Sequence, residues 1–170
     1  MEEQPPDLVE HALGTVLREI LDGSEPDGGL LLNRGDDGLL RSLDRLSAED
    51  ASALSSPGAA SIAAHVDHLR YGLGLMNRWS QGESPFEDAD WTASWRRNRV
   101  SGDEWERLRA GLRTEAAELQ SALGRLTRAG ETKLTGVIAS VAHLAYHLGA
   151  IRQIDRATRG PTAEENRPPV

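Results

Sequence analysis

Apolar residues recur at three- and four-residue steps along most of this chain, and no convincing stretch alternates with a period of two. This spacing is typical of amphipathic helices. Long helices are predicted over residues 7–22, 59–80, 102–128 and 134–158. A shorter helix is predicted over 39–46, after a loop rich in Gly, Asp and Pro at 23–38. Each long helix has an apolar face to bury, so we expect an all-α protein, an up-and-down four-helix bundle with one or two extra short helices.

The length of 170 residues suits a single domain, which we expect over residues 1–160, followed by a flexible or surface-draped tail at 161–170. The absence of cysteine excludes disulfides, thiolate zinc fingers and cysteine nucleophiles. The net charge of -8 argues against a nucleic-acid partner, because phosphate binding needs a basic face. The N-terminus is acidic and no apolar run approaches the roughly 20 residues of a membrane span. We therefore expect a cytoplasmic protein with no membrane association.

Four of the five histidines form two pairs at helical spacing, His65 with His68 and His143 with His147. Residues four apart share a helix face, so the second pair can converge on one ion. A third imidazole from a facing helix would complete a three-histidine site with an open position, as in catalytic zinc centres. The alternative is a set of core or surface histidines without a metal. Both pairs interrupt apolar stripes, where unpartnered imidazoles are costly to bury, and this favours a shared metal.

Two segments carry a family resemblance: residues 61–69, SIAAHVDHL, and residues 143–153, HLAYHLGAIRQ. They resemble the DinB/YfiT-like superfamily of metal-dependent four-helix bundles, and the resemblance extends over about residues 8–158. It implies metal ligation by His68, His143 and His147. His65, one turn earlier, would either replace His68 or contact the site without binding the metal.

The resemblance also implies a divalent metal, expected to be zinc, with nickel or iron as alternatives. Three neutral histidines leave such an ion its full charge to activate water, a carbonyl or a thiolate. Characterised relatives imply an S-transferase that uses a low-molecular-weight thiol such as bacillithiol or mycothiol, or a hydrolase, with a small-molecule substrate. The alternative is a non-catalytic helical module for ligand binding or dimerisation, with a structural metal or none. A homodimer is plausible, because long bundle helices often leave one apolar face uncovered.

Three of the four tryptophans, Trp91, Trp95 and Trp105, lie close together in the sequence. Trp91 and Trp95, four residues apart, either form a wall of a substrate site or plug one end of the bundle. In the first case the adjacent Arg96 or Arg97 could bind a substrate carboxylate.

Four further polar residues have open roles. Tyr71 follows His68 by one turn and is a candidate proton donor or substrate contact. Asp88 and Asp90 either cap a short helix around Trp91, or one of them accepts a hydrogen bond from a metal-bound histidine. Arg152 is predicted to face away from the histidines, toward a partner chain.

Overall fold

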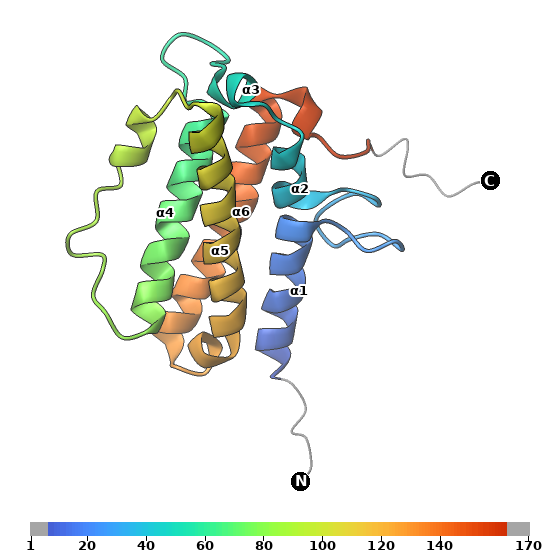
Figure 1. Cartoon of the computed structure of the whole chain (residues 1–170). Helices are drawn as coiled ribbons and strands as arrows, with labels where there is room; N and C mark the ends of the chain where they lie inside the picture. Colours follow the sequence, from blue (N-terminus) through green and yellow to red (C-terminus); the bar gives the residue numbers. More distant parts are fainter. Residues whose placement is uncertain (1–6, 163–170) are drawn as a thin grey trace.

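The computed structural model describes residues 7–162, and every regular element in that range is helical. The four long helices are α1 (Leu8–Asp22), α4 (Ile62–Ser80), α5 (Gly102–Thr127) and α6 (Glu131–Ile154). The short elements are α2 (Gly38–Asp44), α3 (Ala48–Ser52) and the 3₁₀ turns η1 (Ala93–Arg96) and η2 (Arg156–Thr158). The predicted all-α four-helix bundle with extra short helices is confirmed (Figure 1).

Serine caps fix where two of the long helices begin. The Ser61 hydroxyl accepts a hydrogen bond from the amide of Ala64, so α4 starts three residues later than the apolar pattern predicted. Ser101 and Glu104 form a reciprocal capping box at the start of α5. α6 begins three residues before the predicted 134–158 helix and ends four residues before its end. Most of the predicted tail, residues 163–170, lies outside the described residues.

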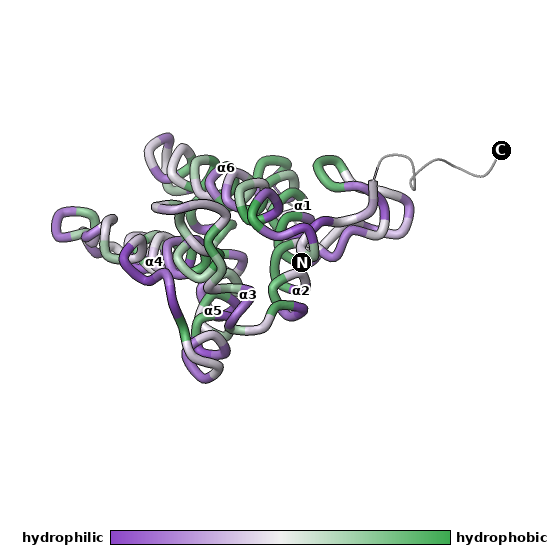
Figure 2. The backbone as a smooth tube through the Cα atoms, turned by 90° about the horizontal axis from the view of Figure 1, so that it is seen from above, coloured by the Kyte–Doolittle hydropathy of each residue, from purple (hydrophilic) through white to green (hydrophobic). Residues whose placement is uncertain are grey.

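α4 and α1 occupy opposite corners of the bundle, because among the long helices each packs against α5 and α6. α1 also packs against α2. Large aliphatic side chains fill the centre, and the most deeply buried include Leu17, Ile20, Leu69, Leu112, Leu119, Leu144 and Ile151. Viewed from above, apolar stretches are prominent on α1, α2 and α6 (Figure 2). The bundle therefore has one continuous core that holds α4 and α6 side by side.

α4 and α5 run in the same direction, because the segment 81–101 crosses back along the outside of the bundle (Figure 1). The Ser61 amide, before α4, donates to the Asn98 side chain, before α5, at 3.0 Å. At the other end, Arg125 of α5 donates to the Ser80 hydroxyl of α4 at 3.2 Å. The helices thus alternate in direction, as expected for an up-and-down bundle, except across this connection, where α4 and α5 are parallel (Figure 1). The connection lies beside α4 rather than at a bundle end (Figure 1).

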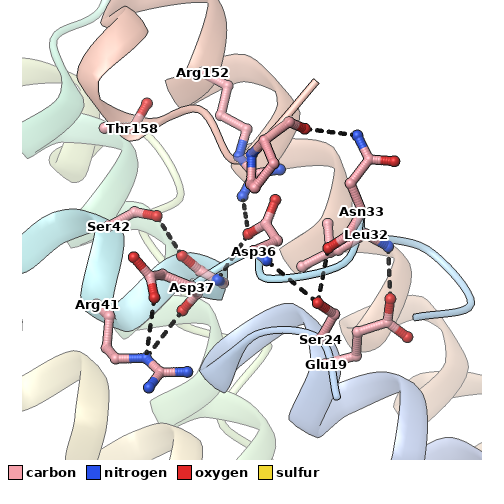
Figure 3. A network of polar contacts seen from close by, with 12 residues as sticks. Glu19, Ser24, Leu32, Asn33, Asp36, Asp37, Arg41, Ser42, Arg152 and Thr158 are labelled. Atoms are coloured by element: carbon pink, nitrogen blue, oxygen red, sulfur yellow. Dashed lines mark hydrogen bonds and ion pairs between the residues drawn. The ribbon is translucent and has the colours of Figure 1, made fainter. Parts of the chain in front are cut away.

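A polar network holds the loop between α1 and α2 against the rest of the fold (Figure 3). The Glu19 carboxylate accepts hydrogen bonds from three consecutive backbone amides, those of residues 30–32. The nearly buried Asp36 accepts one from the Arg152 guanidinium at 2.6 Å and one from the Gly38 amide at 2.8 Å. The prediction that Arg152 faces a partner chain is therefore wrong, because the residue binds a carboxylate of its own chain.

α6 is apolar on more than its core side. Within residues 7–162 it is the one helix with the length and apolar composition of a membrane span, so the expectation that no such segment exists is wrong. Core helices of water-soluble proteins have the same composition, and 33% of the apolar window is buried here. α6 also carries two of the predicted metal ligands, on the side that faces α4.

Candidate metal centre

The four paired histidines meet between α4 and α6. The Nε2 atom of His143 lies 3.1 Å from the Nε2 atom of His68 and 2.9 Å from the Nε2 atom of His147. One donor nitrogen from each of these three residues fits within a group 4.8 Å across. His68 and His147 are buried and His143 is partly buried. The structure thus assembles the three side chains that the sequence singled out.

Burial keeps these imidazoles neutral. Desolvation is the largest cause of the shift at each, and it lowers the pKa of His65, His68, His143 and His147. The neighbouring histidines add repulsion, which brings the pKa of His68 to about 4 and that of His147 to about 3. Neutral imidazoles have a free lone pair, which is the form that binds a metal ion.

The contacts around His143 Nε2 favour a bound cation over hydrogen bonds alone. A neutral ring nitrogen carries either one hydrogen or one lone pair, so it can make one hydrogen bond in the ring plane. His143 Nε2 has two nitrogen neighbours at that distance. A cation that accepts a lone pair from each nitrogen satisfies all three. Zn–N bonds of 2.0–2.1 Å in a tetrahedral site would place the ligand nitrogens about 3.3 Å apart, close to the observed spacing.

His65 contacts the opposite side of His147. Its Nδ1 atom lies 2.8 Å from the Nδ1 atom of His147, outside the three-nitrogen group. When His147 presents Nε2 to the ion, its Nδ1–H can donate to His65. Of the two roles left open by the resemblance, the structure supports contact with the site and does not place His65 in the position of His68.

The two tryptophans of the crossover lie against the histidines. The Trp95 ring centroid is 4.5 Å from that of His68 and 5.3 Å from that of His65, and Trp91 is 5.9 Å from His68. Both rings therefore lie against the histidine group, and Trp91 also lines the adjoining cavity, which supports the first of the two predicted roles for Trp91.

The two arginines that follow Trp95 hold the crossover in place. Arg97 pairs with the buried Asp67 of α4 at 3.0 Å, and Arg96 pairs with Asp90 at 3.0 Å. Each guanidinium therefore already has a carboxylate partner within this chain, so neither is needed to bind a substrate carboxylate.

Tyr71 and Asp90 have structural roles in this arrangement. The Tyr71 hydroxyl accepts a hydrogen bond from the Asp90 amide at 3.0 Å. The Asp90 carboxylate accepts from the amide and hydroxyl of Thr92, which with Arg96 lowers its pKa to about 2. Asp90 therefore caps the turn before η1. This is the capping role that was one of the two predicted. Sequence spacing could not show the contact between Asp90 and Tyr71, because it joins two separate segments.

A cavity of about 470 Å³ adjoins the three-histidine group, and His68 and His143 form part of its lining. Its remaining lining residues come from one face of α4, one face of α6 and the crossover. The volume is within the usual range of small-molecule sites. A metal ion held by the three histidines would thus have access to a bound small molecule.

Comparison with known proteins gives one match. The family model of the DinB superfamily matches residues 31–151. A search of curated proteins found no significant match. A search of solved structures found none either. The matched segment includes both histidine pairs and covers more than half of the chain, so the protein belongs to the DinB superfamily.

Proposed function

We propose that this protein is a metal-dependent enzyme that holds one divalent ion through the Nε2 atoms of His68, His143 and His147. The observation that carries the proposal is the position of this group, because two of its three residues also line a cavity of small-molecule size. The substrate is a small molecule bound in that cavity.

The donor set suits a borderline metal. Imidazole nitrogens accept zinc, nickel and iron, and we propose zinc as the ion bound, with the other two as alternatives. Three neutral ligands leave the full positive charge on the ion, which supplies a Lewis acid and lowers the pKa of a bound thiol or water. Two reactions suit this chemistry. In the first, the thiolate sulfur of a low-molecular-weight thiol such as bacillithiol or mycothiol bonds to an electrophilic substrate as that substrate's leaving group departs. The second is hydrolysis.

The second candidate is a non-catalytic module with a structural metal. Structural zinc sites are closed by four protein ligands, whereas catalytic sites keep one position open. Within the described part of the chain, no fourth His, Asp or Glu joins the three-histidine group. The open position favours the catalytic proposal.

The first test is elemental analysis of tag-free protein, comparing wild type with His68→Ala, His143→Ala and His65→Ala. We expect a single ion per chain in wild type, loss of the ion in the first two variants and retention in the third at saturating zinc. A wild-type protein that binds no metal when zinc is supplied at neutral pH would overturn the proposal. Retention of metal by His68→Ala together with its loss in His65→Ala would contradict the ligand assignment.

The catalytic part needs a separate measurement. Turnover of an electrophile in the presence of bacillithiol or mycothiol, or of an ester without thiol, is compared before and after chelation. Activity that is lost on chelation and restored by zinc supports an enzyme. Metal binding with no turnover across thiol and water assays supports the non-catalytic module.

A further inference from the structure

The cavity beside the three histidines is a groove between α4 and α6. α4 provides one face, from His68 at one end to Trp79 at the other, and α6 runs antiparallel to it with His143 and Gly136 at the matching ends. The eleven residue steps from His68 to Trp79 give the groove a length of about 16 Å. A Cβ atom on Gly136 would lie 2.6 Å from the Trp79 ring, so glycine at this position lets the indole lie against α6.

Aromatic rings form the outer wall of this groove. Phe86 lies 5.6 Å from Trp79 and 6.4 Å from Trp91 between ring centroids, and Trp91 continues the wall to His68. Phe86 and Trp91 are still 40% and 41% exposed despite these contacts. Part of each ring is therefore available for contact with a molecule in the groove.

Apart from the two histidines, the groove has almost no polar chemistry. Its other lining residues are Gly72, Leu73, Met76, Trp79, Phe86, Trp91, Gly136, Ala139 and Ser140. The Ser140 hydroxyl donates its hydrogen to the Gly136 carbonyl at 3.0 Å, so it has no further hydrogen to donate to a ligand. None of these lining residues is charged.

The cations beside the groove have partners of their own, and none of them lines it. Lys133 donates to the Trp79 carbonyl at 2.5 Å and stands over the indole, 3.5 Å from the ring centroid. The arginines of η1 and its C-terminal flank are paired with Asp90 and Asp67. Away from the end formed by His68 and His143, a carboxylate, sulfonate or phosphate in the groove would thus lose its hydration without gaining an ionic partner.

We propose that the groove selects an uncharged molecule with a flat apolar body, aromatic or alicyclic, and one polar group at the end nearest His68 and His143. The body packs along Trp91, Phe86 and Trp79, where burial of apolar surface provides affinity. The polar end is the reacting end. This assignment of ends rests on the proposed function, whereas the preference for an uncharged apolar body rests on the groove alone.

The test compares two probes that share one skeleton and differ in charge. N-phenyl-1-naphthylamine is neutral, and 8-anilino-1-naphthalenesulfonate is the same molecule with an added sulfonate. Each is titrated into the wild-type protein and its fluorescence gives a dissociation constant. In protein freed of metal by chelation, we expect the neutral probe to bind at least about tenfold more tightly, because the sulfonate then has no ionic partner in the groove. Equal affinities, or tighter binding of the sulfonate, would overturn the proposal.

Two matched variants locate the binding. Ala139 is exposed on α6 and lines the groove, whereas Ala110 is exposed on α5 and does not. Ala139→Trp should weaken binding of the neutral probe at least about tenfold, and Ala110→Trp should change it less than about twofold. A neutral probe that binds both variants equally is bound elsewhere, and this would also overturn the proposal.

Both proposals can fail independently. The probe titrations are made on protein as purified and after chelation, and selective binding by metal-free protein supports the groove assignment even if the protein proves not to use a metal. A protein that binds zinc through the three histidines but shows no preference for the neutral probe after chelation contradicts the groove assignment alone.

Discussion

His65 and His147 face one another through their Nδ1 atoms, and this contact determines how His147 can bind a metal. Metal-bound histidines usually donate their second ring N–H to a fixed acceptor, which sets the tautomer and the ring orientation. At 2.8 Å, the His65 Nδ1 atom is placed to be that acceptor. Its ring is held in turn by an edge contact with Trp95. His65 is therefore a positioning residue for His147.

Removing this acceptor should weaken metal binding without abolishing it. We predict that His65→Ala lowers zinc affinity at least about tenfold, the usual cost of losing such a partner. A glutamine at this position keeps an acceptor oxygen, so His65→Gln should retain more affinity than His65→Ala. Competition with a chromogenic chelator measures both. Unchanged affinity in His65→Ala would show that the contact does not orient His147.

The lowered pKa values also predict how stability depends on pH in chelated, metal-free protein. Above the ordinary value of 6.5 His147 is neutral in both states, and its contribution to stability is fully present. As the pH falls from 6.5 toward 3, only the unfolded chain takes up the proton, so the contribution is progressively lost.

The free energy of unfolding should fall by about 1.4 kcal/mol per pH unit for each such histidine once the pH is well below 6.5. His147→Gln should remove one such contribution from the slope between pH 6 and pH 4. Urea unfolding at several pH values measures this slope in both proteins. Equal slopes would mean that His147 is protonated in the folded state.

Sequence spacing paired His65 with His68 and His143 with His147, because a helix brings residues three or four apart to one face. The choice of His68 over His65 as a ligand came from the family resemblance. It could not show that His65 meets His147 through Nδ1, because that depends on rotation of both rings. The partners of Tyr71 and Arg152 were not predicted for a related reason. Each binds a residue from a different segment of the chain, and no local pattern records such a pairing.

At the scale of elements, a buried ion pair joins α6 to the loop before α2. Arg152 and Asp36 are 16% and 3% exposed, so removal of the arginine leaves a carboxylate in a site that water hardly reaches. We predict that Arg152→Ala lowers the free energy of unfolding by about 3–5 kcal/mol.

The exposed pair between Arg96 and Asp90 provides a matched control. Surface ion pairs contribute about 0–1 kcal/mol, so Arg96→Ala should have a small effect. Denaturant melts of the two variants and wild type measure the difference. If both variants lose a similar free energy of unfolding, the burial of Asp36 does not increase the contribution of its ion pair to stability.

The long helices were predictable because each repeats its apolar residues over four or more turns, whereas their directions were not. The crossover gives α4 and α5 the same direction, and its length of about twenty residues was read only as a connection. α3 was not predicted either, although Ser47 and Asp50 form a capping box at its start. A helix of five residues is too short to show apolar periodicity.

For the whole molecule, the metal would join two helices that are distant in sequence, since His68 lies on α4 and His143 and His147 lie on α6. An ion that binds only the folded chain at a hundred times its dissociation constant stabilises it by about 2.7 kcal/mol. For a chain of this size we expect zinc to raise the Tm by about 5–10 °C. Calorimetry of chelated and zinc-loaded protein measures the shift. His143→Ala should show almost none, and an equal shift in that variant would place the bound ion elsewhere.

The cytoplasmic location and the homodimeric state expected from the sequence stay predictions. Ile138 and Tyr146 of α6 are 49% and 71% exposed, so this helix presents apolar surface on the side away from the core. If a second copy covers that surface, Tyr146→Glu should shift the protein from dimer to monomer in sedimentation velocity experiments. A wild-type protein that sediments as a monomer at high concentration would show that no second copy is needed.

In the crossover from α4 to α5, the side chains that line the proposed groove are separate from those that fill the bundle interior. The crossover's side chains face the ligand groove and the histidines, yet Phe86 and Trp91 contribute little to the bundle interior. Substitutions at Phe86 and Trp91 should therefore change what the proposed groove accepts while the core stays intact. Selectivity for the bound molecule could thus change through substitutions in this segment, either by mutagenesis or in the evolution of related proteins.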